Sequence, residues 1–192
     1  PSTSDIEVSV TWKPFFLSHD APRHPAKPLN KMDHYNAKFG AARVAAMIPQ
    51  MKANGASLTP PIAFSYGGTI GNTLDSHRLI RWAREHGGEA AQDAYVEAIF
   101  SAYFEQEKNV AAHDTLLAAA ETAGLDVDAA SAFLKSDALE AETLSEAEEL
   151  RRSMSISGVP FFVLGGKYAV SGAQDPSAFT QIFAKLIEED AT

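Results

Sequence analysis

The sequence of 192 residues contains no cysteine. Disulfide bonds, thiolate nucleophiles and cysteine metal ligands are therefore excluded within it. A chain of this length can bury a core large enough to fold without disulfides or a structural metal. Apart from His77, the histidines show no metal-ligand spacing with one another, and we predict no metal site.

Positive charge is scarce as well. Only 16 lysines and arginines stand against 25 aspartates and glutamates, for a formal net charge of -9. Binding to nucleic acids or to anionic membranes needs a basic surplus that neutralises phosphates. We therefore expect neither a nucleic-acid partner nor a membrane partner.

Long apolar runs are missing too. None approaches the roughly 20 residues that a membrane-spanning helix needs, and no signal-peptide pattern opens the chain. Cytoplasmic localisation is therefore the default expectation. The first residue is Pro1 rather than Met, and we expect the natural N-terminus to lie outside this sequence.

Residues 6–13 alternate between apolar and polar side chains, which predicts a strand that Pro14 interrupts. Three prolines within 18–30 then indicate a loop. The middle of the chain has helical spacing. Asp33 can cap a first helix that stops near Asn54, and Asn72 or Thr73 can cap a second that ends at 87–88. Further helices are predicted over 90–107, 114–123, 128–136 and 139–152.

The last forty residues change character. Residues 160–164 and 167–171 are short apolar strands, and the pair Gly165-Gly166 between them predicts a hairpin turn. Asp175 and Pro176 then start a helix with an apolar face. The predicted order is strand, several helices, hairpin and helix, which is an α/β arrangement.

The sharpest local pattern is Gly158-Val159-Pro160-Phe161-Phe162. Taken alone, it favours a trans proline at the head of an edge strand, because only about 5% of X-Pro bonds in folded proteins are cis. The same residues, however, resemble the DsbA-like thioredoxin proteins, and most closely their FrnE branch. That branch is related to 2-hydroxychromene-2-carboxylate isomerases and kappa-class glutathione transferases. Four further stretches share the resemblance, in family order: 10–15, 72–79, 102–110 and 166–174.

The resemblance implies a thioredoxin-like sheet, incomplete at the N-terminus, with a large all-helical insertion. Residues 1–30 and 153–192 would form the thioredoxin-like core, and residues 31–152 the helical insertion. The implied activity is that of a thiol-disulfide oxidoreductase. Its partner would be a thiol or disulfide, carried by a peptide or a small molecule, and a homodimer is compatible with the family.

The resemblance also implies a substrate-binding site. Pro160 would be cis, and the backbone of Gly158 and Val159 would face the catalytic motif and pair with an extended peptide or glutathione. In the glutathione-using relatives, the γ-glutamyl group lies where Gln174 and Asp175 stand here. Glutathione is therefore a candidate cofactor, although Asp175 as a simple N-cap is the favoured alternative.

Two residues of the insertion resemble family positions that face the site. His77 could tune a thiolate or orient a substrate, and the alternative is a hydrogen-bonded packing residue. Asn72 could contact the ligand, and the alternative is a helix cap.

The family's first strand, with its Cys-Pro-x-Cys or single-serine motif, has no counterpart here, so no catalytic residue is predicted in this chain. We expect the chain to be a fragment that lacks this motif, and the alternative is that another segment fills the place of the strand. Three functions stay open: a thiol-disulfide oxidoreductase, a glutathione-dependent isomerase or transferase, and a non-catalytic thioredoxin-like binding module.

Overall fold

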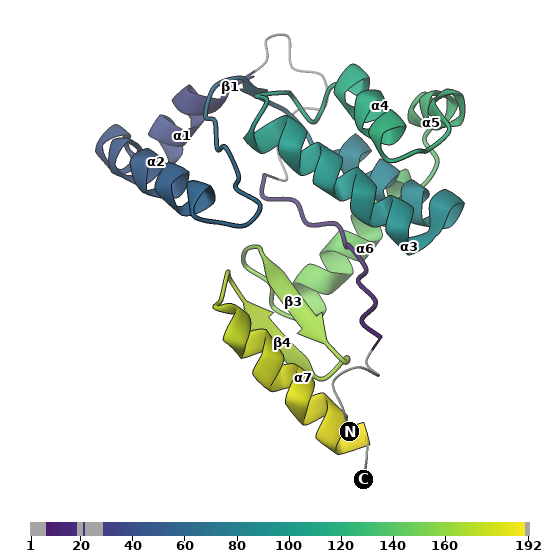
Figure 1. The fold of residues 1–192 in the computed structure, drawn as a ribbon. Helices are drawn as coiled ribbons and strands as arrows, with labels where there is room; N and C mark the ends of the chain where they lie inside the picture. The colour runs from purple at the N-terminus through teal and green to yellow at the C-terminus, as the bar shows by residue number, and fades with distance from the viewer. Residues whose placement is uncertain (1–6, 19–20, 22–28, 191–192) are drawn as a thin grey trace. The chain divides into compact units, whose positions relative to one another are not determined.

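The computed structural model describes residues 7–18, 21 and 29–190. Within them, helices dominate, and two pairs of antiparallel strands accompany them (Figure 1). The elements in chain order are β1 (Leu29–Asn30), α1 (Lys31–Phe39), α2 (Ala41–Ala56), β2 (Thr69–Ile70), α3 (Leu74–Phe104), α4 (His113–Thr122), α5 (Val127–Leu134), α6 (Glu140–Ser153), β3 (Phe161–Leu164), β4 (Tyr168–Ser171) and α7 (Pro176–Asp190).

The chain divides into two compact units, Pro1–Leu144 and Ser145–Thr192. The boundary falls inside α6. The first unit holds the other helices up to α5, and the second holds the β3–β4 hairpin and α7. The assignment of residues 1–30 and 153–192 to one core stays a prediction. Among the described helices, none combines the length and the apolar character that crossing a membrane requires.

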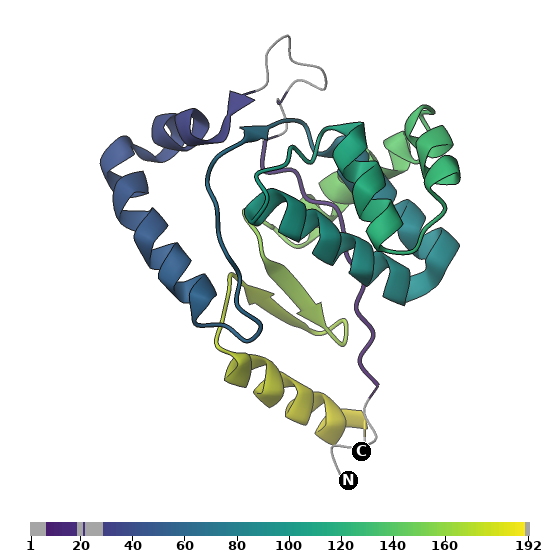
Figure 2. The same ribbon diagram turned by 45° about the horizontal axis from the view of Figure 1, so that its top comes forward.

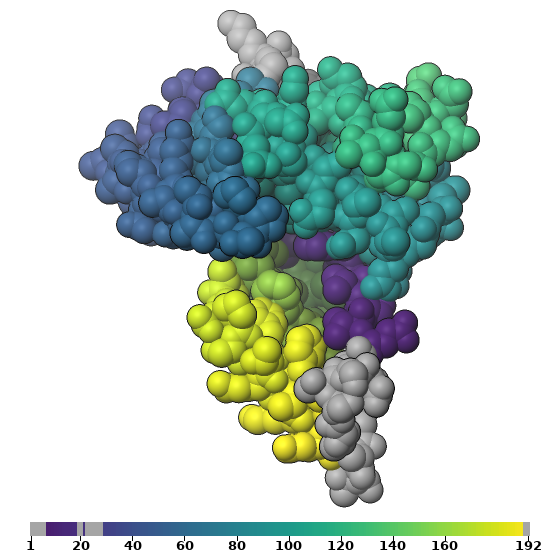
Figure 3. All heavy atoms as spheres, viewed as in Figure 1, coloured from purple at the N-terminus to yellow at the C-terminus, as the bar shows by residue number. Residues whose placement is uncertain are grey.

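The core of the first unit lies between α3, α4 and α5. Leu79, Tyr95 and Leu116 are completely buried there, and Trp82 stacks on Phe133 with ring centroids 5.7 Å apart. Burial of each such side chain stabilises the fold by roughly 1.5–3 kcal/mol. In the space-filling view, the atoms of α3, α4 and α5 (teal to green) form one closely packed surface (Figure 3).

The predicted helix end at 87–88 is confirmed as a bend within α3. Gly88 has φ 76° and ψ -165°, so α3 consists of two helical runs that meet at this residue. Only glycine adopts that conformation without strain. The bend lets both runs pack on the same core.

The prediction of one helix capped by Asp33 is wrong in two respects. The cap is Asn30, whose side-chain oxygen accepts a hydrogen bond from the Asp33 amide. Gly40, with φ 86°, then separates α1 from α2. A left-handed glycine ends a helix by turning the chain out of the helical path. Figure 2 shows residues 57–68 running back from the end of α2 to β2, which pairs with β1.

The predicted strand over residues 6–13 is also wrong in its described part, residues 7–13, which have no regular secondary structure. The Val10 amide donates to the Glu89 carboxylate (2.6 Å), and the Trp12 amide donates to the Gln92 side-chain oxygen (3.3 Å). Side chains of α3 therefore take the hydrogen bonds that a neighbouring strand would supply.

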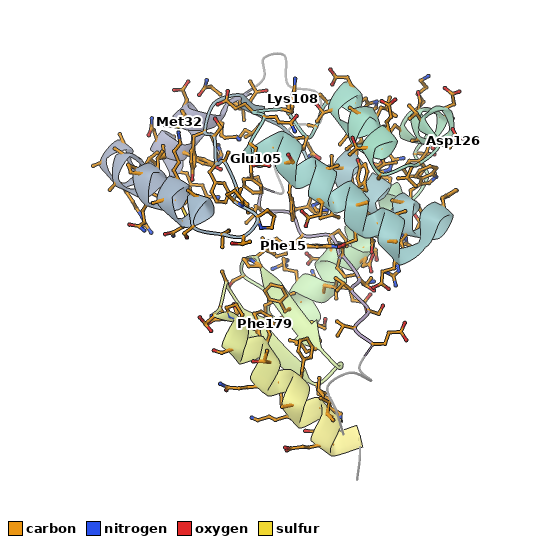
Figure 4. The ribbon with its side chains drawn as sticks, in the orientation of Figure 1. Phe15, Met32, Glu105, Lys108, Asp126 and Phe179 are labelled. Carbon is orange, nitrogen blue, oxygen red and sulfur yellow. The ribbon has the colours of Figure 1, made fainter. Side chains whose placement is uncertain are left out.

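The predicted hairpin and final helix of the second unit are confirmed. Phe161 pairs with Ser171 and Leu164 with Tyr168, so β3 and β4 are antiparallel. Phe179 projects from α7 toward the hairpin (Figure 4) and meets Phe162 edge-to-face at 4.9 Å. This contact places α7 against one face of the hairpin.

Candidate functional site

The Val159–Pro160 turn leads directly into β3. The peptide bond is cis in the structure, the geometry that the family resemblance implies. The Pro160 carbonyl accepts a hydrogen bond from the Gly172 amide (2.8 Å), which ties the turn to the end of β4. Val159 keeps 46% of its surface exposed, and Gly158 is half-buried. The turn therefore presents an apolar side chain beside a fixed backbone.

The described second unit leaves one edge of β3 without a neighbouring strand. In an antiparallel ladder, every second pair of opposite residues is joined by backbone hydrogen bonds. Pro160 and Gly172 form such a pair, so the next one is Phe162 with Val170, and the backbone of Phe162 faces β4. The backbone groups of Phe161 and Val163 then face the other edge. Val163 is 45% exposed. This edge can accept an extended polypeptide as an additional strand.

Gln174 and Asp175, predicted to bind glutathione, are both exposed and hydrogen-bond within the chain. The Gln174 amide donates to the Ser171 carbonyl (3.0 Å), and the Asp175 carboxylate accepts from the Ser177 amide (2.9 Å). Hydrogen bonds from the side chain and the backbone of Ser177 lower the pKa of Asp175. These contacts fit the alternative reading of Asp175 as a helix cap.

His77 lies on the first turns of α3, in the first unit. Its Nε2 is 3.1 Å from the Phe15 carbonyl oxygen, and its ring meets Phe16 edge-on at 5.1 Å. Burial lowers the pKa of His77 to about 4, and the hydrogen bond to Phe15 opposes this only in part. At neutral pH the side chain is therefore an uncharged hydrogen-bond donor to the backbone.

Asn72 bonds through both ends of its amide. Its oxygen accepts from the Leu74 amide (2.8 Å), and its nitrogen donates to the Ala21 carbonyl (2.6 Å). Thr73, the other predicted cap, makes no side-chain capping bond. Asn72 therefore caps α3 and bonds its start to Ala21.

The structure ties the turn of Gly158, Val159 and Pro160 to Gly172, which follows β4 and lies two residues before Gln174. Asn72 and His77 belong to the first unit. Their position beside Val159 stays a prediction, as do all the binding roles assigned to these residues. In the part of the chain that the structure describes, no group of three or more histidine and carboxylate side chains could hold a metal ion.

Sequence reasoning missed two buried cations. Arg78 is completely buried and bonds to Asp75, whose other oxygen lies 3.0 Å from His113 Nε2. Lys31 is 1% exposed, donates to the Tyr103 carbonyl and lies over the Tyr103 ring. Burial lowers the pKa of Lys31. Asp75 and Arg78 at i and i+3 were the available signal for the buried arginine. Nothing in the sequence around Lys31 signals its burial.

The hairpin with its preceding proline turn, the helix behind it and the helical first unit define an α/β protein of thioredoxin-like fold with a helical insertion. A family model described as the DSBA-like thioredoxin domain matches residues 2–184, so the chain belongs to that family, which is of the thiol-disulfide oxidoreductase type.

A solved structure supports this assignment. The crystal structure of a probable DsbA oxidoreductase from Streptomyces coelicolor superposes with a TM-score of 0.73 at 29% sequence identity. The match covers 88% of this chain and 71% of the Streptomyces chain. A search among curated proteins found no match.

Proposed function

We propose that this chain forms the substrate-docking part of a thiol-disulfide oxidoreductase of the DsbA type, in its FrnE branch. The Val159–Pro160 turn would hold an extended thiol- or disulfide-bearing polypeptide through the backbone of Val159. Because these 192 residues contain no cysteine, the reactive thiols would come from residues outside them.

The observation that carries the proposal is the exposed apolar turn at the head of an edge strand. Val159 is nearly half exposed, and the hydrogen bond from the Gly172 amide to the Pro160 carbonyl (2.8 Å) fixes the turn that presents it. A fixed, exposed backbone of this kind can pair with an extended peptide. Membership of the DSBA-like family and the 29% identity to the Streptomyces protein support the oxidoreductase chemistry.

The chemistry would follow ordinary thiol-disulfide exchange. A thiolate attacks one sulfur of the substrate disulfide and forms a mixed disulfide, while the other substrate sulfur leaves as a thiolate. A second thiol then resolves the mixed disulfide. The contribution of Val159 would be to hold the substrate backbone still, so that the attack is effectively intramolecular.

Insulin reduction by the natural full-length protein tests the proposal. Val159→Asp should slow insulin reduction strongly and leave reduction of a small linear disulfide, bis(2-hydroxyethyl) disulfide, nearly unchanged, since only the polypeptide needs the docking turn. Leu58→Asp is a matched control, because Leu58 is similarly exposed at 51% and lies in the first unit. Equal rates for wild type and Val159→Asp on insulin would refute the docking role.

The coding sequence upstream of Pro1 separates the three functions. A Cys-x-x-Cys motif there supports the oxidoreductase, and a lone serine with activity toward glutathione conjugates supports the isomerase or transferase. A protein with neither motif that still binds extended peptides would be a non-catalytic module. We expect the 192-residue chain itself to reduce no insulin, and measurable turnover would contradict the proposal.

A further inference from the structure

We propose that a row of four aromatic side chains on the first unit binds an extended, proline-rich polypeptide segment that carries arginine or lysine. The row consists of Trp12, Phe100, Phe104 and Phe64. Phe100 and Phe104 are 41% and 37% exposed, and the other two rings are half-buried. The proposed oxidoreductase function makes no use of these residues.

The aromatic row follows the second helical run of α3, which supplies its two central rings. At one end, the Trp12 indole donates to the Asp93 carboxylate (3.0 Å). At the other end, the Ser65 amide donates to the Phe104 carbonyl (2.7 Å), which holds the neighbouring Phe64 beside the helix. Hydrogen bonds therefore attach both outer members of the row to α3.

Successive rings of the row meet edge-to-face. The ring centroids of Trp12 and Phe100 are 5.7 Å apart, those of Phe100 and Phe104 5.9 Å, and those of Phe104 and Phe64 5.8 Å. The planes of these pairs meet at 86°, 64° and 90°. Rings at such angles form ridges with slots between them, and they do not form the flat platform on which nucleic-acid bases stack.

The spacing of the slots fits a polyproline II helix. Such a helix advances about 3.1 Å per residue, so two residues span about 6.2 Å, close to the distance between neighbouring rings of the row. Proline-rich segments dock on rows of aromatic side chains because their extended conformation exists before binding and costs little entropy. An extended proline-rich segment can therefore place successive pyrrolidine rings between the aromatic ones.

Carboxylates on the same helix face select the charge of the partner. Asp93, Glu97 and Phe100 stand at i, i+4 and i+7 of α3, so they share one face, and both acidic residues are exposed. Nucleic acid would be repelled there. A second copy of this chain would bring the same two carboxylates and a net charge of -9. A basic polypeptide is the partner with the complementary charge.

Fluorescence anisotropy of a labelled peptide tests the proposal with the natural full-length protein. The probe holds six prolines between two arginines, and we expect saturable binding. A peptide with six serines between two arginines keeps the charge and loses the preformed extended helix, so it should bind at least tenfold more weakly. The proline peptide with glutamates at its ends should show no saturable binding. No saturation with the arginine–proline probe, or equal binding of the serine peptide, would overturn the proposal.

Three variants locate the binding. Phe100→Ser removes a central ring and should weaken binding of the arginine–proline probe by about tenfold or more, a loss of about 1.4 kcal/mol. Phe39→Ser is the matched control, because Phe39 is 42% exposed at the end of α1, and it should bind like the wild type. Glu97→Gln should weaken binding at low salt and have little effect at high salt, where exposed charges are screened. A Phe100→Ser protein that binds the probe normally would refute the site.

Discussion

The imidazole of His77 and the backbone carbonyl of Phe15 are joined by a hydrogen bond of 3.1 Å, across 62 positions of sequence. The carbonyl oxygen can only accept, so His77 Nε2 donates. This bond fastens the irregular N-terminal segment to α3 at a place where no strand pairing does so. Its strength depends on His77 staying uncharged in a buried site.

The His77–Phe15 contact predicts a loss of stability in mild acid. Burial lowers the pKa of His77 from 6.5 to about 4, so the unfolded chain binds its proton more readily than the folded one. The free energy of unfolding should therefore be highest above pH 6.5 and should fall between pH 6.5 and 4. At about 1.36 kcal/mol per pKa unit, the loss attributable to this residue is roughly 3 kcal/mol.

Urea unfolding followed by tryptophan fluorescence reports on this effect, because Trp12 and Trp82 both lie in the first unit. His77→Gln keeps a donor for the Phe15 carbonyl and should flatten the pH dependence between pH 4 and 6.5. His34→Gln is the control and should keep the wild-type slope. An unchanged slope in His77→Gln would show that another group causes the acid sensitivity.

Arg78 should be among the most sensitive positions of the first unit. Its guanidinium donates to the Asp75 carboxylate (2.8 Å) and to the carbonyls of Ser136 (2.7 Å) and Ala138 (2.9 Å), and it is completely buried. Arg78→Met removes the buried cationic donor that these three acceptors share. We expect a loss of about 3–5 kcal/mol in the free energy of unfolding.

Arg78→Lys should recover little of this loss, because one ammonium group cannot reproduce the planar fork. Arg81→Met is the control: Arg81 pairs with Glu85 on the exposed side of the same helix, and such pairs contribute at most about 1 kcal/mol. Similar unfolding midpoints for Arg78→Met and Arg81→Met in urea would contradict the assigned role.

The two glycines of the β3–β4 turn should tolerate substitution differently. Gly165 and Gly166 both have positive φ (55° and 67°), and the Lys167 amide closes their turn by donating to the Leu164 carbonyl (3.1 Å). A Cβ at Gly165 would lie 2.5 Å from a methyl group of Leu186, whereas a Cβ at Gly166 would meet nothing within 4 Å. Asparagine adopts positive φ readily, so Gly166→Asn should be nearly neutral and Gly165→Asn clearly destabilising.

Amide hydrogen exchange of β4 measures this difference within the second unit. Protection at Val170 should survive in Gly166→Asn and decrease in Gly165→Asn. Equal protection in the two variants would mean that α7 does not pack on the turn as the structure has it.

Asp175 should stabilise the start of α7 in a pH-dependent way. Hydrogen bonds from Ser177 lower the pKa of Asp175, so the folded state binds the proton less readily than the unfolded one. This contribution is present at neutral pH and is lost as the pH falls through the folded-state pKa. Asp175→Ala should reduce amide protection in the first turn of α7 at pH 7, while Asp175→Asn should retain it, as asparagine also caps helices. Loss of protection in both variants would argue against a simple cap.

Several elements were predictable because their signals are local. Gly165-Gly166 between two apolar runs specifies the hairpin, and Pro176 after Asp175 marks the start of α7. The bend at Gly88 follows from glycine's access to positive φ. In each case a few neighbouring residues carry the preference, and packing agrees with it.

The N-terminal segment could not be predicted in the same way. Alternation over residues 6–13 is a sound strand pattern, but a strand needs a partner as well as a pattern. In the structure, Glu89 and Gln92 of α3 occupy the amides of Val10 and Trp12. Likewise, Asn30 rather than Asp33 is the cap of α1, because β1 passes directly into the helix and the Asn30 side chain accepts from the Asp33 amide.

The sequence by itself determined that no thiol chemistry can occur within these residues. It also determined the positions of the helices and the hairpin, and the family to which the motifs point. Tertiary structure alone decided that Arg78 and Lys31 are buried and that His77 bonds to Phe15. The physical reason is range: backbone preferences act over a few residues, whereas burial and charge pairing depend on groups that only folding brings together.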